Sequence, residues 1–276
     1  MLWQIVRFPR CFAQFIPGGK TVTLLRHSAG ETSSLNCKTL MVTGAAGSLG
    51  SALSHAAAAR GFNLVLLDSD CQGLERLYDR LVEEGFSEPA LQLTDLATVG
   101  PDDLQEIVAA VEEQFGGLDA LVHCAARFDS LTPLEHVPPE EWLLSMQVNL
   151  NAAWLLSALC LPLLRKAGHG HLYFLLEDMD EVGGALWGPY GISKHALRAL
   201  VGQLALECQT AGVRVLGINP GPMQSPLRSR AYLAEHPASA PSPSVAAEQI
   251  VELLLRTREP SGTCLDLAGM DVDARA

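Results

Sequence analysis

Tyr190 and Lys194 stand four residues apart in the segment 187–194, which reads WGPYGISK. On an α-helix these two positions share one face about a turn apart, so a phenol and an ammonium would be neighbours. A neighbouring ammonium favours the phenolate and lowers the pKa of the phenol from its ordinary value of about 10. The pair therefore predicts a general acid or base that works near neutral pH. The same spacing is also typical of the start of an ordinary amphipathic helix.

A glycine-rich segment gives the second chemical signal. Residues 43–50 read TGAAGSLG, and they join an apolar run at 39–43 to an Ala-rich helical pattern at 48–60. Glycines in such a turn allow close approach of a pyrophosphate, and the helix N-terminus offers free N–H groups and a positive dipole end. The position between a strand and a helix favours nucleotide binding over a plain turn.

Asp68 closes the next apolar run, 18 residues beyond Gly50. A carboxylate at that position can accept hydrogen bonds from both ribose hydroxyls of an adenosine and would repel a 2′-phosphate. Neither Ser69 nor the glycine segment supplies an Arg to hold that phosphate. The sequence therefore favours NAD over NADP. A helix-capping role, the alternative for an Asp here, suits Asp70 better.

Short apolar runs alternate with helical patterns from Lys38 onward. Strands are expected at 39–43, 63–68, 90–93, 119–124, 171–176, 213–218 and 263–267, and helices at 48–60, 71–84, 103–115, 138–164, 190–209 and 246–255. This alternation predicts an α/β fold, with a doubly wound parallel sheet in a single domain over residues 38–276. Residues 226–244 hold four Pro and predict a mobile loop beside the site.

Composition narrows the classes of function. Hydrophobic residues make up 48% of the 276, yet no apolar run reaches the roughly 20 residues that span a bilayer, so no membrane partner is expected. A net charge of -12 argues against a nucleic-acid partner, because such a partner carries a negatively charged phosphate backbone. The seven Cys are scattered without a C-x-x-C pair, which indicates neither disulfides nor zinc and fits a reducing, cytoplasmic setting. His169 and His171 lack a third ligand nearby, so no metal is expected.

The first residues differ from the rest of the chain. Residues 1–30 carry Arg7, Arg10, Lys20 and Arg26 and no acid. We expect residues 1–37 to be an N-terminal extension, either flexible or a mitochondrial-type targeting segment. The fold prediction leaves them out.

From Lys38 to Leu267 the chain resembles the short-chain dehydrogenase/reductase superfamily. The resemblance rests on landmarks in order: the glycine segment, Asp68, Asp95-Leu96, Val148-Asn149, the Tyr190 and Lys194 pair, and Asn219-Pro220-Gly221. Their sequence contexts look like the classical oxidoreductase branch. The resemblance implies hydride transfer between a nicotinamide and a small-molecule carbonyl or secondary alcohol. It also implies a homo-oligomer assembled through the long helices.

The resemblance implies a role for each matched position. Cofactor-binding positions would be Gly44, Gly47, Leu49, Gly50, Asp68, Asp95, Leu96, Cys124, Ala125, Pro220 and Gly221. Tyr190 would pass the proton, while Lys194 would bind the nicotinamide ribose and lower the pKa of the phenol. Asn149 would steady a water in a proton relay to Lys194.

Two departures from the family pattern concern the cofactor end. The glycine spacing T-G-x-x-G-x-x-G is usual in the larger, extended members, although this chain is too short for their extra substrate-binding region. The motif after the fourth strand, normally Asn-Ala-Gly, reads Cys124-Ala125-Ala126. An Asn that braces the sheet is therefore missing.

The third departure is Glu177, thirteen residues before Tyr190, where the family places a Ser that polarises the substrate carbonyl. Residues 171–189 contain no Ser or Thr. An ionised carboxylate about 4 Å from a developing oxyanion would cost on the order of 4 kcal/mol, or roughly three decades in rate. Alternatively, a protonated Glu177 donates the missing hydrogen bond, or the carboxylate points to a cationic group of the substrate. The chain is thus predicted to be an oxidoreductase, or else a nucleotide-binding sensor or interaction partner that has lost catalysis.

Overall fold

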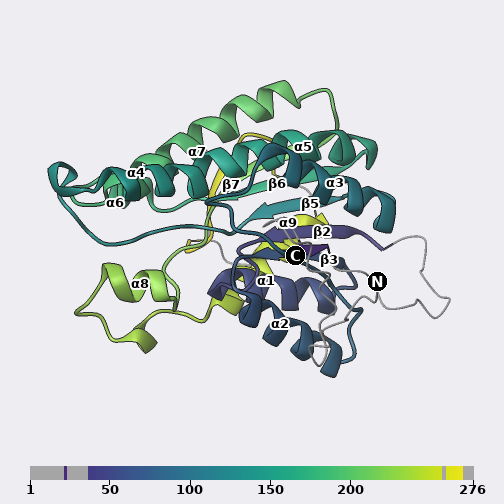
Figure 1. Ribbon diagram of the computed structural model, residues 1–276, viewed down its shortest axis with the longest axis horizontal. Coiled ribbons are helices and arrows are strands. Elements are labelled where there is room, and N and C mark those ends of the chain that lie inside the picture. Colours follow the sequence, from purple (N-terminus) through teal and green to yellow (C-terminus); the bar gives the residue numbers. More distant parts are fainter. Residues whose placement is uncertain (1–21, 24–36, 257–258, 270–276) are drawn as a thin grey trace, which may run out of the picture.

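The computed structural model describes residues 22–23, 37–256 and 259–269, and the described residues form one sheet of eight strands (Figure 1). The strands lie in the order β1-β4-β3-β2-β5-β6-β7-β8. Their bounds are β1 Val22–Thr23, β2 Thr39–Thr43, β3 Asn63–Asp68, β4 Ala90–Leu93, β5 Ala120–His123, β6 Gly170–Leu175, β7 Val213–Asn219 and β8 Cys264–Asp266. Strands β2 to β8 are parallel, and β1 pairs antiparallel with β4. The predicted doubly wound α/β fold is confirmed.

Helices cover both faces of this sheet (Figure 1). They are α1 Ser48–Ala59, α2 Cys71–Glu83, α3 Pro101–Phe115, α4 Pro139–Met146, α5 Ala152–Lys166, α6 Met179–Val182, α7 Gly188–Glu207, α8 Pro226–Ala231 and α9 Pro243–Arg256. One core cluster packs α1, α2 and α9 against the sheet, and a second packs α3, α5 and α7 against the other face. Both strand faces are therefore buried, which explains why the strands read as continuous apolar runs.

The order of the strands locates the site. The chain moves from β2 outward through β3 to β4, returns to β5 on the other side of β2, and then runs outward to β8. Open α/β sheets bind ligands beyond the carboxyl ends of their strands at such a reversal. Here the reversal lies between β2 and β5.

The long helix predicted at 138–164 is interrupted near its middle. A π-helix at Gln147–Asn151 joins α4 to α5. The combined helix Pro139–Lys166 is long and apolar enough to cross a membrane by length and composition, but half of its apolar window is buried. It packs against α3 and α7, as a core helix does.

Three parts of the chain differ from the prediction. The segment 226–244, predicted as a loop, contains α8 and a 3-10 helix at Pro237–Ser239, because Pro fits the first turn of a helix and Ser225 caps α8 by accepting from the Arg228 N–H at 3.1 Å. The short helix α6 was not expected. Strand β1 lies within the extension 1–37, most of which is outside the described residues.

Candidate functional site

A cavity of about 760 Å³ opens where the parallel strands end at the reversal. Thirteen of the residues singled out from the sequence line it: Gly44, Gly47, Leu49, Asp68, Asp95, Leu96, Cys124, Ala125, Glu177, Tyr190, Lys194, Pro220 and Gly221. Gly50 and Asn149 are not among the lining residues. The fold thus brings segments more than 170 residues apart in the chain to one hollow.

The glycine segment forms a tight turn at one end of the cavity. Gly44 has a φ of +66°, and a Cβ there would lie 2.6 Å from the Ala125 Cα. A Cβ on Gly50 would lie 2.1 Å from the Gly44 carbonyl oxygen, so Gly50 allows α1 to pack against the turn. No side chain caps α1. Its first N–H groups have no acceptor within the helix and can receive an anion.

Asp68 combines two hydrogen bonds with a position on the cavity wall. Its carboxylate accepts from the Ala46 N–H and from the Asp70 N–H, both at 2.9 Å. Asp70 caps α2 by accepting from the Gly73 N–H at 3.0 Å, in agreement with its predicted role. The basic residues that line the cavity, Arg127, Lys194, Arg228 and Arg230, come from other segments than the end of β3. Near that strand end, Arg76 of α2 is paired with Asp70 at 3.6 Å, and no ion pair with Asp68 is formed among the described residues.

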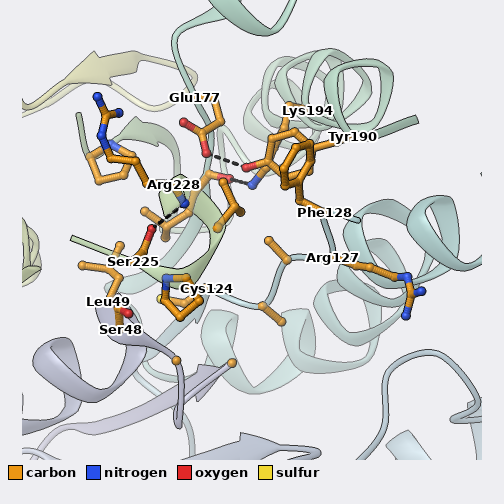
Figure 2. Close-up of a pocket in the computed structure, with 18 of the residues that line it drawn as sticks. Ser48, Leu49, Cys124, Arg127, Phe128, Glu177, Tyr190, Lys194, Ser225 and Arg228 are labelled. Carbon is orange, nitrogen blue, oxygen red and sulfur yellow. Dashed lines mark hydrogen bonds between the residues drawn. The ribbon is translucent and has the colours of Figure 1, made fainter. Parts of the chain in front are cut away.

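Tyr190, Glu177 and Lys194 meet at the other end of the cavity (Figure 2). The buried Tyr190 phenol donates to Glu177 Oε1 at 2.5 Å. Lys194 Nζ donates to the Leu175 carbonyl oxygen at 2.7 Å and lies 5.4 Å from the centre of the Tyr190 ring. Lys194 is buried as well. The helix spacing therefore places the two side chains as neighbours, but the partner of the phenol is the carboxylate.

This geometry changes the expected ionisation of the phenol. Burial, and next the negative charge of Glu177, raise the pKa of Tyr190 well above its ordinary value. Burial also lowers the pKa of Lys194, and the Glu177 charge opposes that shift. The expectation that Lys194 lowers the pKa of Tyr190 is thus wrong for this arrangement. At neutral pH the phenol keeps its proton and can act as a donor.

Asn149 is buried in the π-helix and is not among the residues that line the cavity. Its Oδ1 accepts from the Arg127 N–H at 2.6 Å, and its Nδ2 lies 3.0 Å from both the Arg127 carbonyl oxygen and Ser193 Oγ. The amide therefore braces the segment after β5, where the family's own Asn is replaced by Cys124. Sequence reasoning gave Asn149 a water-steadying role and missed this brace.

An aromatic wall borders the Tyr190 end of the cavity, formed by Phe128, Trp187 and Tyr232 beside Tyr190. The Phe128 and Tyr190 rings are 5.3 Å apart, and the Trp187 ring lies 5.4 Å from Phe128, 5.8 Å from Tyr190 and 6.3 Å from Tyr232. These residues come from three separate segments, so no spacing in the sequence could have grouped them.

Charged groups near the aromatic wall are largely paired. Arg228 donates to Glu235 Oε1 at 3.0 Å and lies over the Tyr232 ring at 4.4 Å. The Tyr232 hydroxyl donates to Glu181. Burial, with the charges of Asp178 and Glu177 adding to it, raises the pKa of Glu181. Carboxylates thus gather at this end of the cavity.

The sequence and the structure were compared with known proteins, and both comparisons point to one family. Residues 38–235 match the family model for short chain dehydrogenases. The chain belongs to the short chain dehydrogenase family. An uncharacterized oxidoreductase, YciK, of Escherichia coli K12 is 30% identical over 210 residues, which cover 76% of this chain and 83% of that protein.

Two solved structures of the family show the same fold. A short chain dehydrogenase from Pseudomonas syringae superposes with a TM-score of 0.81 at 32% identity, covering 88% of this chain and 99% of that one. Another from Shigella flexneri, complexed with NADP, gives a TM-score of 0.78 at 28% identity and covers 84% and 98% of the two chains.

Proposed function

We propose that this protein is an NAD(P)-dependent oxidoreductase in which Tyr190 supplies the proton. The observation that carries the proposal is the single cavity that holds the glycine turn at one end and Tyr190, Glu177 and Lys194 at the other. The protein complexed with NADP among the structural relatives supports a nicotinamide cofactor.

The residues present fit a dinucleotide. The turn at Gly44 and Gly50 has no room for a Cβ, and the uncapped α1 leaves N–H groups for a pyrophosphate. Asp95, Leu96, Cys124, Ala125, Pro220 and Gly221 would line the path of the cofactor from adenine to nicotinamide. Lys194, held by the Leu175 carbonyl oxygen, would keep a positive charge at the nicotinamide end. When bound, the reduced cofactor supplies a hydride.

Asp68 favours NAD in this proposal. Its carboxylate faces the cavity at the end of β3, and Ser69 and Asp70 that follow are neutral and acidic. A 2′-phosphate would meet this carboxylate, and the neighbouring Arg76 is already paired with Asp70 at 3.6 Å. The relative from Shigella flexneri was solved with NADP, so membership of the family does not decide between NAD and NADP. The preference of this protein has to be measured.

A Tyr190→Phe variant tests the proposal. It keeps the ring packing of the aromatic wall and removes the phenol proton. We expect NADH binding, followed by cofactor fluorescence, to stay within about threefold, while turnover falls at least a hundredfold, since general acid catalysis contributes about that much. Turnover that survives in Tyr190→Phe would contradict the assignment of the proton donor.

The 2.5 Å hydrogen bond between Tyr190 and Glu177 supports a second candidate function. With its proton already bonded to a carboxylate, the phenol is a poorer donor to a carbonyl, and the protein would then bind a nucleotide as a sensor or partner. NADH binding without turnover on carbonyls or imines, together with turnover that appears in Glu177→Ser, would favour this alternative.

A homo-oligomer formed by α4, α5 and α7 completes the proposal. Leu143, Trp154 and Leu206 on these helices are more than half exposed. Large apolar side chains exposed on neighbouring helices are typical of surfaces that associate.

A further inference from the structure

The group nearest to the proton donor is a carboxylate, and this restricts the substrate. Glu177 Oε1 lies 2.5 Å from the Tyr190 phenol oxygen, so any substrate atom that takes the phenol proton must sit beside Glu177. A carbonyl oxygen in that position becomes negative as hydride arrives. At about 4 Å the repulsion would slow the reaction about a thousandfold.

An imine nitrogen in the same position becomes positive where a carbonyl oxygen becomes negative. When it accepts a proton it becomes a cationic N–H group, which can donate a charge-assisted hydrogen bond to Glu177. The carboxylate that hinders a carbonyl thus stabilises the electrophile that a C=N bond forms.

The surroundings of Glu177 agree with a cationic substrate. Arg127 is paired with Asp129 at 2.8 Å, and Arg228 is paired with Glu235. Figure 2 shows Glu177 and Tyr190 pointing toward each other, with Lys194 beside Tyr190 and the Arg127 side chain pointing away. The Glu177 charge opposes the lowering of the Lys194 pKa, but Lys194 Nζ is bonded to the Leu175 carbonyl oxygen at 2.7 Å. Within the described residues, no Lys or Arg nitrogen lies within the 4.0 Å ion-pair distance of Glu177 or Glu181.

The aromatic wall adds a second feature suited to a cation. Phe128 and Trp187 lie along the same end of the cavity as Glu177, whereas the Arg228 guanidinium already covers the Tyr232 ring at 4.4 Å. Aromatic faces attract organic cations through the ring quadrupole, and most strongly in a desolvated site. Combined with a carboxylate, they form the kind of surface that recognises an iminium or ammonium group.

We infer that the reactive group of the substrate is a C=N bond, and that the enzyme reduces a cyclic or secondary imine to an amine. The inference rests on the proposed oxidoreductase function. Tyr190 donates its proton to the imine nitrogen, and Glu177 accepts a hydrogen bond from the resulting N–H. The hydride from the reduced nicotinamide forms the new C–H bond, and the C=N π electrons become the nitrogen lone pair. The cofactor is oxidised, the imine is reduced, and water returns a proton to Tyr190.

Matched pairs of substrates test this inference. The purified protein with NADH or NADPH is assayed on 1-pyrroline and cyclopentanone, on 2,3,4,5-tetrahydropyridine and cyclohexanone, and on 3,4-dihydroisoquinoline and 1-tetralone. We expect kcat/KM to be at least tenfold higher for the imine of a pair. Preference for the ketones would overturn the inference and leave the proposed oxidoreductase function standing. Oxidation of NADH with no member of any pair, despite NADH binding, would overturn both.

Variants of Glu177 isolate the role of its charge. Glu177→Gln keeps the shape and removes the charge, and Glu177→Ser supplies the hydroxyl typical of the family. We expect the ratio of imine to ketone kcat/KM to fall at least tenfold in Glu177→Gln and by more in Glu177→Ser. Glu113→Gln, the same change on the exposed surface of α3, should leave the ratio unchanged. An unchanged ratio in both folded Glu177 variants would contradict the inference.

Binding provides a readout that does not depend on turnover. Tetrahydroisoquinoline is an ammonium ion at neutral pH, and 1-tetralol is a neutral molecule of similar size. With the oxidised cofactor present, the ammonium should bind at least tenfold more tightly to the wild type and lose that advantage in Glu177→Gln. Equal binding of the two compounds to the wild type would count against a cation site.

Discussion

The Tyr190 phenol has one proton, and in this chain Glu177 already holds it through a hydrogen bond. The raised pKa of Tyr190 keeps that proton in place at neutral pH. The phenol is therefore protonated at neutral pH but weakly acidic, and a basic acceptor atom takes its proton more readily than a carbonyl oxygen does. At the scale of single residues, we propose that Glu177 determines which substrate atom can receive this proton.

Asp68 is the residue on which cofactor choice depends. In Asp68→Asn the side chain keeps an oxygen for the Ala46 or Asp70 N–H but loses the charge that would repel a 2′-phosphate. We expect the ratio of kcat/KM for NADH to that for NADPH to fall at least tenfold. Asp102→Asn makes the same charge change at an exposed position in the first turn of α3, outside the cavity lining. An equal shift in both variants would show that overall charge, not Asp68, sets the preference.

At the scale of elements, the turn between β2 and α1 depends on Gly50 for its packing. A Cβ would overlap the Gly44 carbonyl oxygen, which belongs to the backbone and cannot rotate away. The N-terminus of α1 could then no longer lie against the turn that is proposed to hold the pyrophosphate.

A pair of Gly→Ala variants tests this packing. Gly50→Ala should lower the melting temperature by several degrees and weaken NADH binding at least tenfold. Gly202→Ala in α7 makes the same change where no heavy atom lies within 4 Å of the new Cβ, so it should stabilise the protein by about 0.5–1 kcal/mol. Thermal unfolding and NADH titration measure both. Tolerance of Gly50→Ala would mean that the turn can rearrange.

Much of the element order was predictable, because each buried strand is a continuous apolar run and each long helix carries an apolar stripe. Residues 63–68, for example, form β3 as predicted. The helices α6 and α8 were missed because they are too short for periodicity and contain or follow turn-forming residues. The hydrogen bond between Tyr190 and Glu177 was not among the options that the sequence left open for Glu177, since it depends on how the end of β6 approaches α7. The aromatic wall depends on contacts among three segments that are far apart in the chain, so the sequence could not predict it.

At the scale of the whole molecule, buried histidines make stability depend on pH. His123 is stacked on Phe174 with ring centres 5.0 Å apart, and its Nε2 lies 2.9 Å from Ser157 Oγ. Burial lowers the pKa of His123 to about 3. In the unfolded chain the His123 imidazole therefore binds a proton below about pH 6.5, whereas in the folded protein it binds one only below about pH 3.

The contribution of neutral, buried His123 to the free energy of unfolding is therefore fully present above about pH 6.5. It decreases as the pH falls from about 6.5 toward about 3. We expect this residue to lower the free energy of unfolding by about 1.4 kcal/mol per pH unit in that window. In His123→Leu, Ser157 Oγ can still donate to the Ala153 carbonyl oxygen. Urea unfolding at pH 7.5, 6.5, 5.5 and 4.5 should give a shallower decline for the variant. Parallel curves would contradict this account.

Association of copies can be tested on the same scale. Trp154→Glu combined with Leu206→Glu places charges on the exposed apolar positions of α5 and α7, and we expect a smaller species in light scattering than for the wild type. Leu233→Glu, at the most exposed of the large apolar residues described, lies outside these helices and should leave the size unchanged. A wild type that is already monomeric would refute the proposed oligomer.

The Asn149 amide connects two parts of the protein that a reaction must keep aligned. Through Arg127 it fixes the segment that would lie under the cofactor, and through Ser193 it reaches the helix that carries Tyr190 and Lys194. Because one amide is bonded to both parts, we expect them to move together, so that the cofactor and the proton donor would keep their separation. The Asn149 side chain, which would touch no reacting atom, would in this way limit how far the hydride donor and the proton donor can move relative to each other.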